Sequence, residues 1–166
     1  MRLFSLCFAL LLAAGAPALL RAAAPAPAQV VLDISDFHSI DESGAPFTEA
    51  ATVLVTHPAV TLAAHDGLPT LSVRQPLTLE LTALSSDTGE TYTPLAVVFE
   101  QQGAASDPVG ARNFTVTPTA HGTLLIVDRC ATTGADGCFE FFVVVRRDCD
   151  GALGIIDPGL INLAPL

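Results

Sequence analysis

Two strongly β-prone runs near the C-terminus constrain this chain more than any other feature. They read TLLIVDR over residues 123–129 and FEFFVVVR over residues 139–146, and Cys130 and Cys138 bracket the connection between them. Branched and aromatic side chains at this density are typical of strands, and a short connection between two such runs is typical of a hairpin. The sequence therefore predicts a β-hairpin closed by a Cys130–Cys138 disulfide, a bond that forms outside the reducing cytosol.

A direct pairing of the two cysteines would fix the register of this hairpin. Residues that lie opposite each other on antiparallel strands point to the same face. Val127 would then meet Phe141 on one face and Ile126 would meet Phe142 on the other, so both faces would be apolar. A strand pair of this kind is expected in the middle of a sandwich or under a partner.

The same register brings two carboxylates together. Asp128 would lie opposite Glu140, and like charges at that distance repel each other. Either the register shifts by two residues, or Arg129, Arg146 or a bound cation relieves the repulsion. We favour a simple shift or splaying of the strands near the loop.

The first residues have the pattern of a secretory signal peptide. A short basic start precedes an apolar run, Leu3–Leu20, and an Ala/Pro tract follows it. The rule for small residues at the cleavage site places the cut after Ala28, so residues 1–28 are the predicted signal peptide and residues 29–166 a single domain. The alternative is an uncleaved membrane anchor, although Arg21 would then lie on the exported side.

The charge of residues 29–166 limits the possible partners. This part of the chain holds all 17 acidic residues but only five arginines and no lysine, which gives a formal charge of −12. Such a surface repels phosphate backbones, so we expect no nucleic-acid partner. No later apolar run approaches the roughly 20 residues of a membrane helix, so we also expect no membrane span after signal cleavage.

Turn residues recur every eight to fifteen positions, and the runs between them are rich in Val, Leu, Thr and Phe. This spacing is typical of an all-β sandwich or barrel, and we predict a single immunoglobulin-like antiparallel β-sandwich. The candidate strands are Gln29–Ile34, Thr52–Thr56, Val60–Ala63, Thr70–Val73, Leu77–Thr82, Leu95–Glu100, Asn113–Thr117, Thr123–Arg129, Cys138–Arg146 and Gly159–Leu163. The clearest alternation is Leu77–Thr82, which should place three leucines on the core face.

Three cysteines remain after the signal peptide, so one is left over from the predicted disulfide. Cys149 is the expected unpaired thiol, because an extended strand would carry it too far from Cys138 to form a bond. Its neighbours Asp148 and Asp150 should raise the pKa of this thiol and make it a poor nucleophile. Cys149 could form an intermolecular disulfide or remain a buried or simply unpaired thiol.

The sequence offers no catalytic or cofactor-binding residue that we would assign. Asp87-Thr88-Gly89 matches the tripeptide of aspartic proteases, but turn chemistry explains it better, since polar serines precede it and no second copy exists. The densest set of possible metal ligands is an acidic cluster near the N-terminus. Its members are Asp33, Asp36, His38, Asp41 and Glu42. The cluster lacks the glycine and spacing of a calcium loop, so a solvated acidic loop is favoured over a metal site.

The C-terminal third resembles the DP-EP family of small bacterial proteins. The resemblance rests on TLLIVDR, on GCFEFFVVV, and on the ending Ile156–Pro165, in which Asp157-Pro158 matches the first dipeptide of the family. Ala164-Pro165 departs from the Glu-Pro expected as the second dipeptide. The resemblance implies a small bacterial β domain and transfers no functional residues.

Together these features predict an exported bacterial protein that acts as a noncatalytic binding or structural module, located in the periplasm or outside the cell. Its partner would be a protein or a glycan. One alternative is a small secreted hydrolase, which would need an acid, a histidine or a nucleophile gathered in a pocket. Another is a subunit of a homo-oligomer that assembles through Cys149 or by strand addition.

Overall fold

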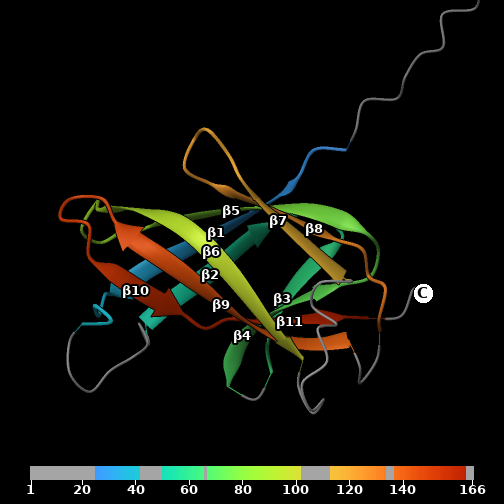
Figure 1. The fold of residues 1–166 in the computed structure, drawn as a ribbon. Coiled ribbons are helices and arrows are strands. Elements are labelled where there is room, and N and C mark those ends of the chain that lie inside the picture. The colour runs from blue at the N-terminus through green and yellow to red at the C-terminus, as the bar shows by residue number, and fades with distance from the viewer. Residues whose placement is uncertain (1–24, 42–49, 66, 102–112, 134–136, 164–166) are drawn as a thin grey trace, which may run out of the picture.

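The computed structural model of the protein describes residues 25–41, 50–65, 67–101, 113–133 and 137–163 (Figure 1). The predicted signal peptide lies almost entirely outside these ranges, although its last residue, Ala28, begins the first strand and is buried. No helix among the described residues is long and apolar enough to cross a membrane.

The described residues form eleven strands. They are β1 (Ala28–Asp36), β2 (Ala50–Thr56), β3 (Val60–His65), β4 (Leu68–Val73), β5 (Leu77–Leu84), β6 (Thr91–Gln101), β7 (Phe114–Pro118), β8 (Leu124–Asp128), β9 (Cys138–Arg147), β10 (Leu153–Ile156) and β11 (Gly159–Asn162). All ten candidate strands are confirmed, with ends that shift by a few residues. The sequence prediction missed β10, a four-residue strand that contains Gly154.

Gly154 explains why β10 has a weak sequence signal. A Cβ at this position would lie 2.5 Å from Cε2 of Phe37 and 3.1 Å from the carbonyl oxygen of His38. A glycine inside a strand often marks such a close approach. The residue that weakens the strand pattern is therefore the one that lets the segment after β1 pack against β10, where the Ile40 amide donates to the Leu153 carbonyl at 2.8 Å.

The strands form a curled mixed sheet in the order β2-β1-β5-β6-β9-β11-β4-β3. β8 pairs with the first part of β5, β7 pairs with β8, and β10 pairs with the second part of β9. Two pairings are parallel, β1 with β5 and β4 with β11, so the predicted purely antiparallel arrangement is wrong. The all-β class is confirmed.

The predicted hairpin is also wrong. β8 pairs with β5 and β7, whereas β9 pairs with β6, β10 and β11. No disulfide joins Cys130 and Cys138 in the structure, which differs from the prediction. Strand propensity and a short connection do not reveal whether two consecutive strands pair. Here the connection carries the chain from one part of the curled sheet to another, and Asp128 consequently lies opposite Leu77 and Phe114 instead of Glu140.

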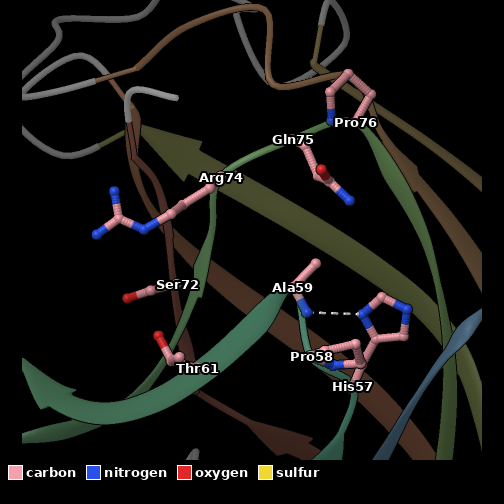
Figure 2. A pocket seen from close by; sticks show the side chains of 8 residues that line it. All are labelled: His57, Pro58, Ala59, Thr61, Ser72, Arg74, Gln75 and Pro76. Carbon is pink, nitrogen blue, oxygen red and sulfur yellow. Dashed lines mark hydrogen bonds between the residues drawn. The ribbon is translucent and has the colours of Figure 1, made fainter. Parts of the chain in front are cut away.

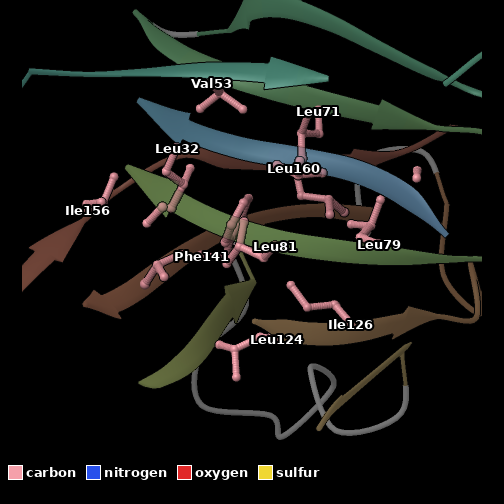
Figure 3. Close-up of a cluster of buried hydrophobic side chains, with 14 of the residues drawn as sticks. Leu32, Val53, Leu71, Leu79, Leu81, Leu124, Ile126, Phe141, Ile156 and Leu160 are labelled. Atoms are coloured by element: carbon pink, nitrogen blue, oxygen red, sulfur yellow. The ribbon is translucent and has the colours of Figure 1, made fainter. Parts of the chain in front are cut away.

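The inner face of the curled sheet holds one hydrophobic core (Figure 3). Alternate residues of each strand point into it, as the period of two requires. In β5 the leucines Leu79 and Leu81 are buried and Leu77 is half-buried, which confirms the predicted alternation. Aromatic rings close the region between β6 and β7, where Phe99 and Phe114 stack with their centroids 3.8 Å apart.

Strand β9 has apolar residues on both faces, as its sequence indicated. Phe139, Phe141, Val143 and Val145 are buried in the core. Phe142 and Val144 point to the outer face and are half-buried. β9 therefore gives the sheet an apolar exterior at the point where β6 and β10 flank it (Figure 1).

Candidate functional site

Outward-facing apolar side chains on β6, β9 and β10 form a continuous surface, which we call the β6–β9 patch. The register places Val98 opposite Phe142, and Ala96 opposite Val144, which in turn lies opposite Ile155. Leu95 adds a further apolar side chain at a register shift in β6. The exposed fractions are 57% for Val98 and 42% for Leu95. Neighbouring exposed apolar residues of this kind mark interaction surfaces more often than isolated ones do.

Charged and polar residues border the patch at both ends of the strands. At one end Glu100 lies directly opposite Glu140 on the neighbouring strand. At the other end Thr93 lies opposite Arg146, whose guanidinium is 3.7 Å from the Asp148 carboxylate. The β6–β9 patch thus has an acidic end and an end that carries an exposed cation.

A cavity of about 740 Å³ lies elsewhere, where the β2–β3 turn meets the segment after β4 (Figure 2). Its lining residues are His57, Pro58, Ala59, Thr61, Ser72, Arg74, Gln75 and Pro76. The Ala59 amide donates to Nδ1 of His57 at 3.2 Å, which leaves Nε2 to act as the donor nitrogen. The Arg74 guanidinium extends away from the imidazole in Figure 2. These described lining residues include no carboxylate, so they do not form the acid–histidine pair of a hydrolase.

A buried polar pair connects the ends of β8 and β11. Asp128 and Asn162 are both fully buried, and Asn162 Nδ2 donates to Asp128 Oδ1 at 3.2 Å. The same Oδ1 atom accepts the Cys130 amide at 2.8 Å. Asp128 Oδ2 and Asn162 Oδ1 have no hydrogen-bond donor among the described residues. Burial raises the pKa of Asp128, and two hydrogen bonds to its carboxylate only partly offset this effect.

The unpartnered oxygens have a simple chemical explanation. A protonated Asp128 has an O–H that can donate to Asn162 Oδ1, while its other oxygen continues to accept from the amide. Each group would then be satisfied, as buried polar groups usually are. The pair therefore connects β8 and β11, and protonation of Asp128 would satisfy the oxygens that otherwise have no donor.

Cys149 lies on the exposed turn after β9, within a charged surface cluster. Its Sγ is 3.8 Å from a carboxylate oxygen of Glu90. Desolvation, Asp150 and Glu90 raise the pKa of its thiol, which confirms the predicted direction. Arg147 makes two hydrogen bonds to Asp150, at 3.0 and 2.7 Å, and its guanidinium carbon lies 4.7 Å from the centroid of Phe37. A protonated thiol in this setting is a poor nucleophile.

The described members of the acidic cluster near the N-terminus, which the sequence favours as a solvated loop, do not gather at one site. Asp33 accepts hydrogen bonds from the Ser86 amide and hydroxyl, at 2.8 and 2.6 Å, and these bonds lower its pKa. Asp36 and His38 form a separate pair at 3.2 Å. Asp41 lies further along the loop, and Glu42 is outside the described residues. No group of three metal-ligating side chains gathers in the part of the chain that the structure describes.

Comparison with known proteins gives a structural likeness and no sequence family. No family model and no curated protein matches this chain. The inclusion body protein PixA from Burkholderia cenocepacia J2315 has a similar structure, with a TM-score of 0.51 and 14% identity. The match covers 82% of this chain and 94% of PixA. At this identity the likeness concerns the fold alone.

Sequence reasoning placed apolar residues on both faces of β9 but missed most of the β6–β9 patch. The sequence predicted the strand that contains Val98 but did not show that this strand pairs with β9. A usable signal was present: 95-LAVVFE-100 lacks the polar alternation seen in 77-LTLELT-82. The cavity and the Asp128–Asn162 pair join segments distant in sequence and left no local signal.

Proposed function

We propose that this chain is an exported bacterial protein, periplasmic or extracellular, that acts as a noncatalytic binding or structural module of immunoglobulin-like sandwich character. The β6–β9 patch is its binding surface. The observation that carries this proposal is the outward position of Leu95, Val98 and Phe142 on adjacent strands, with Val98 more than half exposed. Burying such side chains against a partner releases about 25 cal/mol per Å² of apolar surface.

The curled sheet supports a sandwich-like description because it encloses one core between its two halves. β5 changes partner along its length, from β8 at Leu77–Leu81 to β6 at Ala83–Leu84. Such a change of partner is how strands turn the corner between two packed sheets. In this reading β2-β1-β5-β8-β7 is one layer, and β6 with β9, β10, β11, β4 and β3 is the other.

The test uses the purified protein as bait in the exported fraction of its host, with Val98→Asp and Val127→Asp as matched variants. Val127 is 39% exposed on β8, outside the patch, so its substitution controls for added charge on a sheet surface. We expect a specific partner that Val98→Asp loses and Val127→Asp retains. Turnover of a generic ester, peptide or glycan substrate by the wild-type protein, with no partner captured, would instead favour the hydrolase alternative.

A further inference from the structure

The outward residues of β9 follow a pattern that is symmetric in position and opposite in charge. They are Glu140, Phe142, Val144 and Arg146, and the midpoint of the four is Val143. An acidic residue thus stands three positions before the midpoint and a basic residue three positions after it. The apolar residues lie between them, one on each side of the midpoint. A surface with this pattern is complementary to itself when it is turned end to end.

We propose that the partner at the β6–β9 patch is a second copy of this chain, packed face to face with its strands antiparallel. The inference rests on the proposed function, because it names the partner of the same surface. Consider a two-fold axis that lies between the two sheets, runs perpendicular to the strands and passes over Val143 of β9. This axis brings Glu140 of each copy over Arg146 of the other. The same axis places Phe142 over Val144, so the apolar centres of the two surfaces coincide.

The neighbouring strand β6 fits the same axis. Its outward residues pair laterally with those of β9, so Val98 of one copy meets Ala96 of the other. Glu100 lies over Thr93, whose hydroxyl already donates to Asp148 of its own copy at 2.6 Å, so this position adds no hydrogen bond between the copies. The acidic end of one patch therefore meets the end of the other that carries the Arg146 cation.

Charge excludes the parallel alternative. If the two sheets packed with their strands parallel, Glu100 and Glu140 of one copy would lie over the same pair in the other. Four carboxylates would then share one end of the interface, and like charges at an interface cost several kcal/mol. The ion pairs of the antiparallel arrangement contribute little affinity, since exposed pairs are worth about 0–1 kcal/mol, but they fix its orientation.

The size of the patch sets the strength of the association. Three strands about 4.8 Å apart, followed over about 20 Å of their length, give a face of roughly 300 Å². This is smaller than the roughly 800 Å² per partner of a standard stable interface. We therefore expect a weak dimer, with a dissociation constant on the order of 10 μM to 1 mM.

Sedimentation velocity over about 10 μM to 1 mM tests this inference. The purified protein carries Cys149→Ser in every sample, so that no intermolecular disulfide can contribute. Val98→Asp should weaken association at least tenfold, since it places a carboxylate at the apolar centre. Val127→Asp should leave association unchanged. Thermal unfolding of each variant checks that the fold is retained, and Val98→Lys replaces Val98→Asp if the first variant fails this check.

Charge exchange tests the orientation. Glu140→Arg and Arg146→Glu should each weaken self-association at least tenfold, because each places two side chains of like charge over each other where Glu140 and Arg146 would pair. An equimolar mixture of these two variants should associate, and so should the double variant that carries both substitutions. These two results distinguish pairing between Glu140 and Arg146 from a general effect of surface charge.

Three results would overturn the inference. They are a wild-type protein that stays monomeric up to about 1 mM, a dimer that Val98→Asp leaves unchanged, and a dimer that the single charge variants leave unchanged. The proposed function fails differently. If the protein is monomeric but captures another partner through Val98, the patch is a binding surface and only the second copy is wrong. If Val98→Asp affects neither association nor capture, both proposals are wrong.

Discussion

Asp128 should make the stability of this protein fall as the pH rises. Its carboxyl is fully buried, and burial raises its pKa above the ordinary value of 3.8. Above pH 3.8 the unfolded chain loses this proton while the folded chain retains it. The contribution of Asp128 to the free energy of unfolding is therefore largest below the ordinary pKa. As the pH rises, this contribution is lost progressively until the pH reaches the raised pKa of the folded state. One proton gives a slope of about 1.4 kcal/mol per pH unit within that window.

Asp128→Asn removes this proton without removing the hydrogen bonds. The amide oxygen can still accept from the Cys130 amide and from Asn162 Nδ2, while the new NH₂ group can donate to Asn162 Oδ1. We expect the variant to be at least as stable as the wild type at neutral pH. The difference in free energy of unfolding between the two proteins should change by up to about 1.4 kcal/mol per pH unit above pH 3.8.

Urea unfolding at a series of pH values measures this difference directly. Other carboxylates affect both proteins equally. Asp157, whose pKa burial also raises, contributes a slope of the same sign to each, whereas the lowered pKa values of Asp33 and Glu80 act below the ordinary range. Asp87→Asn, an exposed substitution, serves as the control and should keep the wild-type slope. If Asp128→Asn keeps that slope, or is several kcal/mol less stable at neutral pH, the buried carboxyl is ionised and the reasoning is wrong.

Three further predictions concern stability and the exposed thiol. Gly154→Ala should cost about 1–3 kcal/mol in urea unfolding, because its Cβ would overlap the Phe37 ring, and Phe37→Leu should restore part of the loss; equal stability would mean that the loop moves freely. Glu100→Gln should raise the free energy of unfolding by about 0.2–1 kcal/mol, since it relieves the repulsion from Glu140 on the opposite strand; a loss would show that the charge is compensated. Cys149→Ser should change the free energy of unfolding by less than about 0.5 kcal/mol. The rate at which an alkylating reagent modifies the wild-type thiol should rise with pH only above the ordinary pKa of a thiol. A fast reaction at neutral pH would contradict the raised pKa of Cys149.

The strands of this fold were predictable, but their pairing was not. Each strand has a local sequence pattern, such as the alternation of leucines with polar residues in 77-LTLELT-82. Pairing depends on contacts between distant segments, and the parallel pairing of β1 with β5 joins residues some fifty positions apart. The nearest strand in the chain was the natural partner to assume for β9, and that assumption produced the incorrect hairpin. The sequence likewise could not show that Asp33 accepts hydrogen bonds from Ser86 on a distant segment.

The difference between β5 and β9 is the best evidence that the outer surface has a role of its own. Both strands lie inside the sheet and send alternate residues into the same core. In β5 the other face carries Thr78, Glu80 and Thr82, which suits contact with water. In β9 the corresponding positions carry Phe142 and Val144, which the core does not require.

The residues at the two ends of that face limit what can bind there. Glu140 and Arg146 interrupt the apolar run on either side, and charged residues beside an apolar strand oppose uncontrolled association. A partner must therefore fit between them and match an acidic group at one end and a basic group at the other. A second copy turned end to end satisfies both conditions with the same residues, whereas an unrelated apolar surface would offer neither charge an additional partner.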